Sequence, residues 1–373
     1  MSKDVLSIKY RPKKLSDVIG QTSVVTTLTH AVENNNIHHA YLFHGTRGTG
    51  KTTCSRILAA MINCVDGPTV SPCGKCDHCK AIFLGRHSDI IEMDAASNGK
   101  VDEIRELKKS AYLSPVSGAR KKIYFIDEAH SVTPQGSEAL LKITEEPPSH
   151  VIFILATTEY QKMKGTIISR CQNHFFQKVF WTQIVDHLYK IVKKEQIEID
   201  DSAIKQCAVL ANGSVRDALQ NLNKLNDFAG GEKITIEMAQ NVFGVVNEDI
   251  YYQLMSCIVG EDGKPSISKG YLLINKIFTS GIDVSQFLQG LEEHLRGLQI
   301  MLTAPKTDSL LALTEEEKKR LKVEAGRIDV VKMNKIDDQL KEVRKWLPYN
   351  ISPEKLFDQW LMRSIINCHL SKE

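Results

Sequence analysis

His44-Gly-Thr-Arg-Gly-Thr-Gly-Lys-Thr-Thr53 is the stretch of sequence that decides the fold. It follows a short apolar run, Ala40 to Phe43, and precedes a helical pattern from Thr52 to Ile62. The stretch fits G-x-x-x-x-G-K-[ST], in which glycines let backbone N–H groups turn inward around phosphates. The N-terminus of the following helix adds a favourable potential for anions. The pattern predicts a nucleotide phosphate loop, and a glycine-rich turn with a surface lysine is the alternative.

Two side chains of this loop have a specific expected chemistry. The Lys51 ammonium is expected to reach the β- and γ-phosphates, and the Thr52 hydroxyl to ligate Mg²⁺. The rest of the loop is expected to bind the nucleotide with them: Gly45, Thr46, Arg47, Gly48, Thr49, Gly50 and Thr53.

A second motif, Asp127-Glu-Ala-His130, follows an apolar run from Lys122 to Ile126. An acidic residue at the carboxyl edge of a sheet, near a phosphate loop, can orient Mg²⁺, and its neighbour can activate a water. Asp127 is therefore the predicted metal ligand and Glu128 the predicted general base. The alternative is a helix-capping carboxylate beside a solvated glutamate.

The same four letters occur in one class of RNA helicases. Those proteins need a second α/β lobe, whereas the sequence beyond residue 180 has helical patterns, so that class is rejected. A predicted strand from Asp89 to Met93 falls between the two motifs along the chain. This placement predicts a strand between the loop and the acidic residues, as in ATPases with a catalytic glutamate.

Continuous apolar runs separated by helical patterns are typical of a parallel α/β sheet covered on both faces. The expected strands are 40–43, 89–93, 122–126 and 151–156, with helices at 52–62, 101–110 and 137–144. After Val179 only helical patterns are evident. They cover 181–196, 201–211, 215–228, 250–259, 268–278, 284–303, 314–322, 330–346 and 353–370. The chain is expected to form an α/β domain (1–178), a small helical domain (179–243) and a third, all-helical domain (244–373).

Composition sets wider limits on this chain of 373 residues. Hydrophobic residues make up 42%, which excludes collagen-like, disordered and coiled-coil classes. With 48 Lys and Arg against 45 Asp and Glu, the formal net charge is +3, so any contact with nucleic acid requires a local patch. The first 14 residues lack the apolar core of a signal sequence, and no apolar run is long enough to cross a bilayer. A cytoplasmic protein without membrane contact is expected.

Four of the nine cysteines form a tight cluster with C-x8-C-x2-C-x2-C spacing: Cys64, Cys73, Cys76 and Cys79. In a reducing compartment such a cluster indicates metal rather than disulfides. Four thiolates close a tetrahedral zinc shell, so the predicted knuckle is structural. Four free thiols, or His78 in place of one sulfur, are the alternatives.

Further segments join these motifs in a single resemblance. They are Tyr10-Arg-Pro-Lys13, Asp17-Val-Ile-Gly-Gln21, Asp94-Ala-Ala-Ser97, Ala139-Leu-Leu-Lys142, Glu145-Glu-Pro-Pro148, Leu155-Ala-Thr-Thr158, Ser169-Arg-Cys171 and Gly213-Ser-Val-Arg-Asp217. Together with the loop and the cysteines, they resemble the gamma/tau subunits of bacterial DNA polymerase III, the AAA+ ATPases of the sliding-clamp loader. The resemblance is strong over residues 5–243 and rests on length and position beyond them.

The resemblance implies roles that spacing alone does not give. Thr158, with Thr157 as the fallback, is expected to be the sensor of the γ-phosphate or the attacking water. Arg216 resembles the second sensor in the helical lid, and Arg170 resembles an arginine finger offered to a neighbouring subunit. The alternatives are a helix-capping Thr, a surface Arg and a structural Arg. The residues expected to line the adenine pocket are Arg11, Pro12, Val18 and Ile19.

The resemblance also implies partners. The family forms a hetero-pentamer, held by the third domain as a collar, in which gamma/tau copies assemble with delta and delta-prime subunits. ATP binding opens the beta clamp, and primer-template DNA triggers hydrolysis. On the 101–110 helix, Arg105 and Lys108 are expected to face outward beside Lys100 and contact the DNA backbone, although a solvated face is the alternative.

The chain ends near the end of the expected collar, which corresponds to the shorter gamma form or a shortened tau. Two other functions stay open: a scaffold with this architecture that does not hydrolyse ATP, and another AAA+ DNA motor. The intact loop and acidic motif argue against the first. The cysteine cluster and Ser169-Arg-Cys171 argue against the second.

Overall fold

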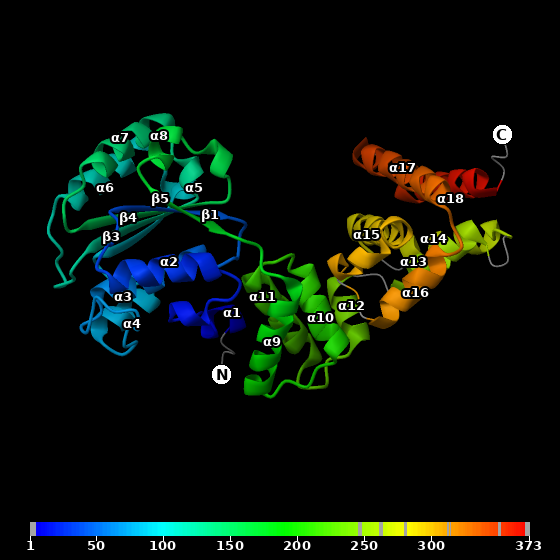
Figure 1. Cartoon of the computed structure of the whole chain (residues 1–373), viewed down its shortest axis with the longest axis horizontal. Helices are drawn as coiled ribbons and strands as arrows, with labels where there is room; N and C mark the ends of the chain where they lie inside the picture. The colour runs from blue at the N-terminus through cyan, green and yellow to red at the C-terminus, as the bar shows by residue number, and fades with distance from the viewer. Residues whose placement is uncertain are drawn as a thin grey trace. The chain divides into compact units, whose positions relative to one another are not determined.

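The computed structural model describes residues 5–244, 248–260, 264–279, 282–311, 313, 315–349 and 352–369. The chain divides into two compact units, residues 1–227 and 228–373, each of which is described by itself (Figure 1). The three-domain division expected from the sequence, with boundaries near 178 and 243, stays a prediction.

The first unit is an α/β fold built on a parallel sheet of five strands. In sheet order these are β2 (Ile90–Asp94), β3 (Lys122–Asp127), β4 (Val151–Thr157), β1 (Ala40–Gly45) and β5 (Gln172–Phe176). The four strands expected from apolar runs are confirmed to within a residue or two. The fifth, β5, was not predicted.

The sheet order corrects one expectation. The strand that lies between β1 and β3 is β4, whereas the strand expected between them, β2, is at the edge beside β3. The carboxyl ends of β1, β3 and β4 therefore meet at one edge of the sheet, where ligands bind in open α/β folds.

Helices cover both faces of the sheet (Figure 1). Alternate residues of each strand enter different cores: Phe43 and Ile154 pack on one face, Leu42 and Phe153 on the other. The first face is covered by α2 (Thr22–Glu33), α3 (Lys51–Asn63) and α4 (Asp77–Phe83), and the second by α5 (Ala95–Asn98), α6 (Val101–Ala111), α7 (Pro134–Glu145) and α8 (Gly165–Ile168). Burial on both faces explains why the strands are continuous apolar runs.

Three helices follow the sheet in the same unit, as predicted: α9 (Trp181–Glu195), α10 (Asp201–Leu210) and α11 (Val215–Ala229). Ile184, Leu188 and Ile191 are buried on one face of α9. The N-terminal segment, which includes α1 (Leu6–Lys9), is tied to this helix. Lys9 forms an ion pair of 2.6 Å with Glu195, which also accepts a hydrogen bond from the Tyr10 hydroxyl.

The second unit is built of helices around its own core, in which Phe287, Phe357 and Trp360 are fully buried. The helices are α12 (Ile236–Phe243), α13 (Glu248–Val259), α14 (Ile267–Thr279), α15 (Val284–Thr303), α16 (Glu315–Ala325), α17 (Val330–Trp346) and α18 (Pro353–His369). The six expected helices are confirmed, except that the predicted end positions 314 and 370 lie outside the described residues. Helix α12 was not predicted. None of the described helices is long and apolar enough to cross a membrane.

Candidate nucleotide site

The predicted phosphate loop joins β1 to α3. Two of its glycines are required because other parts of the chain lie too close for a side chain. Gly45 and Gly48 have φ angles of +142° and +75°. A Cβ at Gly45 would lie 2.1 Å from the Phe176 carbonyl oxygen of β5, and one at Gly48 would lie 1.9 Å from the Ser214 hydroxyl. A side chain at either position would therefore displace the loop from β5 or from the start of α11.

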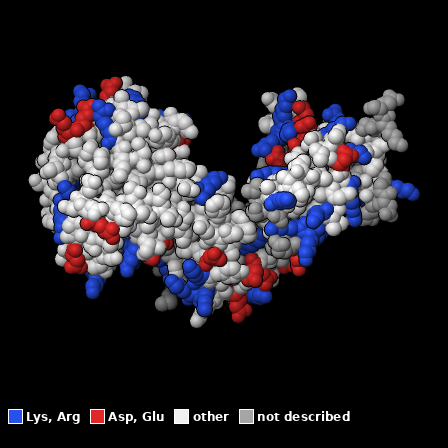
Figure 2. Space-filling view, in the orientation of Figure 1, with Lys and Arg blue, Asp and Glu red and all other residues white. Residues whose placement is uncertain are grey.

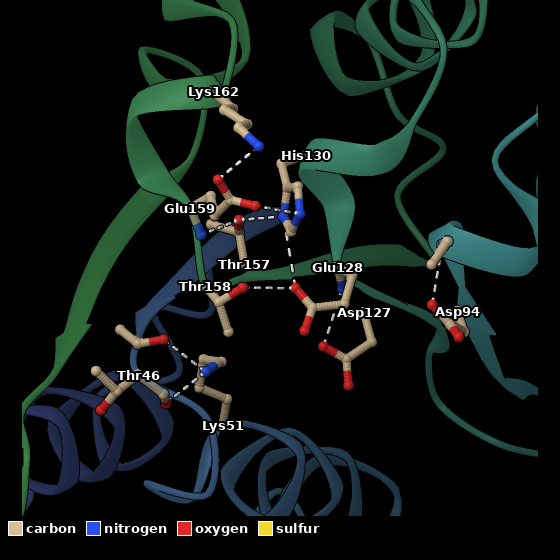
Figure 3. A network of polar contacts seen from close by, with 12 residues as sticks. Thr46, Lys51, Asp94, Asp127, Glu128, His130, Thr157, Thr158, Glu159 and Lys162 are labelled. Atoms are coloured by element: carbon tan, nitrogen blue, oxygen red, sulfur yellow. Dashed lines mark hydrogen bonds and ion pairs between the residues drawn. The ribbon is translucent and has the colours of Figure 1, made fainter. Parts of the chain in front are cut away.

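Lys51 is the first residue of α3, and its side chain folds back into the loop. The ammonium donates hydrogen bonds of 2.8 Å to the carbonyl oxygens of Gly45 and Thr46 (Figure 3). Burial lowers the pKa of this ammonium, whereas the charges of Asp127 and Glu128 raise it. The buried cation is thus held by two neutral acceptors and attracted by two nearby carboxylates.

Asp127, at the end of β3, faces the first turn of α3. The Thr52 hydroxyl donates to the Asp127 carboxylate over 3.4 Å. Burial raises the pKa of Asp127, against a hydrogen bond from the Glu128 backbone N–H that lowers it. A hydroxyl and a carboxylate this close supply the hard oxygen ligands that Mg²⁺ prefers.

Glu128 has a φ of +48°, a left-handed conformation that residues with a side chain rarely adopt. Its carboxylate oxygen Oε2 accepts a hydrogen bond of 3.0 Å from the Thr158 hydroxyl (Figure 3). The neighbouring Thr157 is fully buried, and its hydroxyl contacts His130 and the Glu159 backbone instead. Thr158 and Thr157 were the two candidates for the sensor, and only the Thr158 hydroxyl contacts Glu128.

These groups open onto one pocket of about 350 Å³. Its wall contains the four residues expected around adenine (Arg11, Pro12, Val18 and Ile19), loop residues 47–53, Asp127, Glu128, Thr158 and Arg216. Two of the predicted loop residues, Gly45 and Thr46, do not line the pocket. Their carbonyl oxygens instead accept hydrogen bonds from Lys51.

The pocket wall also contains residues that were not predicted: Ser7, Tyr10, Asp17, Asp94, His187, Val215 and Leu219. Leu219 lies three residues after Arg216 on α11, so helical spacing from Arg216 could have found it. No signal in the sequence distinguishes Ser7 or His187.

Four cationic side chains line the pocket: Arg11, Arg47, Lys51 and Arg216. Burial, followed by the charges of Arg56 and Arg216, lowers the pKa of Arg11. Arg216 is also anchored at the loop, because its backbone N–H lies 3.5 Å from the Gly48 carbonyl oxygen. The concentration of positive charge around a phosphate-type loop favours a polyanionic ligand.

The sequence of this chain is similar to those of known replication proteins. A family model for the DNA polymerase III delta subunit matches residues 20–180, and one for the ATPase lid domain of the DNA polymerase III clamp loader subunit matches residues 183–222. The gamma subunit of DNA polymerase III from Buchnera aphidicola is 40% identical over 288 residues, which cover 77% of this chain and 78% of that protein. The chain belongs to the gamma/tau family of DNA polymerase III subunits.

Other members of the gamma/tau family are longer than the matched region. The tau/gamma subunit from Haemophilus influenzae is 44% identical over 261 residues, which are 68% of this chain and 37% of that protein. The chain therefore spans well under two thirds of this relative. Among solved structures, the Thermotoga maritima RuvB branch migration motor matches with a TM-score of 0.47 and 20% identity over 73% of this chain and 86% of that one.

The lid model of the gamma/tau family coincides with the helices that complete the pocket. Residues 183–222 contain most of α9, all of α10 and the first half of α11, including Arg216. His187, Arg216 and Leu219 come from these helices into the pocket wall. The pocket is thus formed by the α/β part and the lid part of a gamma/tau chain, within one compact unit.

Arg170 of this gamma/tau chain lies apart from the pocket. It follows α8, where its side chain is one third exposed. Its guanidinium donates to the Thr166 carbonyl oxygen over 2.7 Å and forms an ion pair with Glu145 of α7. Within the described part of the chain it does not line the pocket.

The four predicted cysteines are brought together beside α3. All four sulfur atoms lie within 4.8 Å of one another, and Cys64 caps the C-terminus of α3 while Cys76 caps the N-terminus of α4. Backbone N–H groups of Lys75 and Cys76 lower the pKa of Cys73 to about 6. His78, the alternative ligand, instead lies 2.9 Å from His87. Burial, in contrast, raises the pKa of Cys79. The donor set of four converging sulfurs fits zinc.

Helix α6 and the residue before it carry the three basic side chains predicted to contact DNA: Lys100, Arg105 and Lys108. Ile104 and Leu107 are buried, and Arg105 is exposed but forms an ion pair of 3.2 Å with Asp102. Lys100 is exposed and Lys108 is half-buried. Figure 2 shows acidic and basic side chains next to one another over the α6–α7 region, so this face carries no single-sign patch.

Proposed function

We propose that this chain is the ATP-hydrolysing motor subunit of a bacterial sliding-clamp loader. The observation that carries the proposal is the convergence, in one pocket, of Lys51, Thr52, Asp127, Glu128 and Thr158 with Arg216 of the lid. A scaffold that only binds nucleotide needs the loop but not the paired carboxylate and hydroxyl at its mouth. Family membership supports the same function.

Each side chain then has a stated task in phosphoryl transfer. Lys51 and the backbone of the loop bind the phosphates, and Arg11, Pro12, Val18 and Ile19 enclose adenine. Thr52 and Asp127 would hold Mg²⁺, which supplies charge neutralisation on the phosphates when bound. Glu128 accepts the proton of the attacking water, Thr158 orients that glutamate, and Arg216 reports the γ-phosphate to the lid.

The proposed partners follow from membership of the family and from the position of Arg170. Copies of this chain would assemble with delta and delta-prime subunits into a pentamer, held by residues 244–373 as a collar. The ring would open the beta clamp and place it on primer-template DNA. An arginine that lies outside its own pocket is suited to complete the pocket of a neighbour.

An ATPase assay with the partner subunits, the clamp and primed DNA, each omitted in turn, tests the function. Turnover that rises only with the complete set supports a clamp-loader motor. Nucleotide binding without turnover under any combination favours the scaffold. Stimulation by branched DNA that does not require the clamp favours a different DNA motor.

Arg170→Ala is expected to leave ATP affinity unchanged, because Arg170 does not line the pocket of its own chain. In the assembled ring, turnover should fall by about 10³-fold, the typical effect of losing an arginine finger. Nucleotide titrations and steady-state turnover with DNA and clamp measure the two effects.

Glu145→Ala is the matched control for Arg170, because it removes the ion-pair partner but keeps the guanidinium. Near-normal turnover in this variant separates action on a neighbour from a structural ion pair. If Glu145→Ala reproduces the Arg170→Ala defect, the finger assignment is wrong.

Removal of zinc is expected to destabilise the first unit. The cysteine cluster joins the C-terminus of α3 to the N-terminus of α4, so its loss should cost about 3 kcal/mol and lower Tm by about 6 °C or more. Metal analysis should find about one zinc per chain before chelation, and calorimetry measures the shift in Tm.

Cys76→Ser should lose the metal, whereas Cys207→Ser, in a separate core, should keep it. Less than about half a zinc per purified chain would indicate free thiols.

A further inference from the structure

His130 lies against the predicted base, although it is not part of the pocket wall. The left-handed turn at Glu128 reverses the chain into a short 3₁₀ helix (Ala129–Ser131). This turn places the Nδ1 atom of His130 within 3.4 Å of Oε2 of Glu128, the oxygen that also accepts the hydrogen bond from Thr158 (Figure 3). The imidazole and the hydroxyl thus contact the same carboxylate oxygen.

The imidazole is itself fixed on its other sides. Its Nδ1 lies 2.8 Å from the Thr157 hydroxyl, and its Nε2 lies 3.3 Å from Oε1 of Glu159. Glu159 in turn pairs with the exposed Lys162 over 2.6 Å. His130 is only 13% exposed, so these contacts leave the ring little freedom to rotate. Each ring nitrogen faces one carboxylate.

We propose that His130 is a positioning residue for Glu128, and that Glu159 orients its imidazole. The Thr158 hydroxyl donates to Oε2 of Glu128, and Nδ1 of His130 lies 3.4 Å from the same oxygen. Oε1 of that carboxylate has no hydrogen bond from the described residues. Oε1 is then the oxygen available to a water in the pocket. The proposal rests on the proposed function, because it assigns a task within the same hydrolysis.

A structural role predicts a different outcome. His130 also lies beside Thr157, the last residue of β4, so it could serve only to pack the strand ends together. Removal of such a residue lowers stability but leaves the geometry of a folded site, and thus turnover of bound ATP, nearly unchanged. If His130 instead positions Glu128, its removal shifts the Glu128 carboxylate by about 1 Å or less. Such a shift lowers kcat but changes the affinity for ATP little.

The test compares three substitutions in the full chain, assembled with its partner subunits, clamp and primed DNA. His130→Ala should lower kcat by about tenfold with an unchanged affinity for ATP. His130→Asn places an amide nitrogen where Nδ1 lies and should retain at least about a third of the original kcat. His130→Gln places it where Nε2 lies, keeps the contact with Glu159 but not with Glu128, and should resemble the Ala variant.

Glu159→Ala provides a second route if His130→Ala does not fold, since Glu159 is nearly half exposed. It should lower kcat by about threefold at unchanged ATP affinity. His150→Ala, which removes an imidazole that bonds the Ala111 and Leu113 carbonyl oxygens far from this network, controls for the loss of a histidine and should have normal turnover.

Three results would overturn the proposal. They are a kcat within about twofold of the original for His130→Ala, equal loss in the Asn and Gln variants, and an unchanged kcat in Glu159→Ala. Absence of hydrolysis in the unaltered chain would instead refute the proposed function, so the two failures are distinguishable.

Discussion

Glu128→Gln is expected to abolish most ATP turnover while ATP binding persists. The amide has the shape of the carboxylate and can still accept the hydrogen bond from Thr158, so the pocket keeps its form. It cannot accept a proton from water, and loss of a general base typically costs about 10²–10⁴-fold in rate. Titration with a fluorescent nucleotide measures binding, and phosphate release measures turnover.

Glu138→Gln is the matched control for this prediction, because Glu138 is exposed on α7 and does not line the pocket. Its turnover should equal that of the unaltered chain. If Glu128→Gln retained more than about a tenth of the original rate, the base would have to be another group. Asp127 is the nearest candidate, and Asp127→Asn would then distinguish proton transfer from metal binding.

The sequence predicts the central strands well because these strands are buried on both faces. All seven residues of β4 are buried, so its apolar run is continuous and easily recognised. β5 is an edge strand in which only His174 and Phe176 are buried, and one of these is polar. A short run with that pattern is indistinguishable from a loop, although its Phe176 carbonyl packs against Gly45 of the phosphate loop.

The order of the strands in the sheet was not predictable from their order in the chain. The expectation that the 89–93 strand separates the loop from the acidic motif followed sequence order. The sheet instead inserts β4 between β1 and β3. This insertion brings Thr158 to Glu128 across 30 positions of sequence. Pairing over such distances depends on packing of the whole unit, which a local pattern does not contain.

Motif spacing predicted the phosphate end of the pocket, because one loop and one strand end carry it. The opposite end is assembled from the N-terminal segment, α9 and α11, so only the resemblance to known proteins indicated its residues. His130 stands in the acidic motif, but neither the motif nor the resemblance indicated a role for it. Its place beside Glu128 depends on one left-handed residue, and a φ of +48° at a glutamate has no signature in sequence.

Lys51→Ala is expected to reduce ATP affinity by about 100-fold or more. Lys51 is only 7% exposed, and its ammonium donates to the carbonyl oxygens of the loop. A charged hydrogen bond is worth about 1.5–3 kcal/mol, so loss of two to the phosphates corresponds to at least two powers of ten in Kd. The substitution also leaves the Gly45 and Thr46 carbonyl oxygens without their present donor, which disfavours the loop conformation. Calorimetric titration with ATP measures the change.

Lys122→Ala separates charge at the pocket from the general cost of removing a buried lysine. The Lys122 ammonium is also buried and also donates to backbone, at the Ser110 carbonyl oxygen, but it lies at the opposite end of β3 from Asp127. This variant should lose stability in thermal unfolding yet bind ATP with normal affinity. Lys51→Ala should lose ATP affinity with a smaller loss of stability, because its side chain contacts the loop rather than a core. Equal loss of affinity in both variants would mean that the sheet, and not the Lys51 charge, governs nucleotide binding.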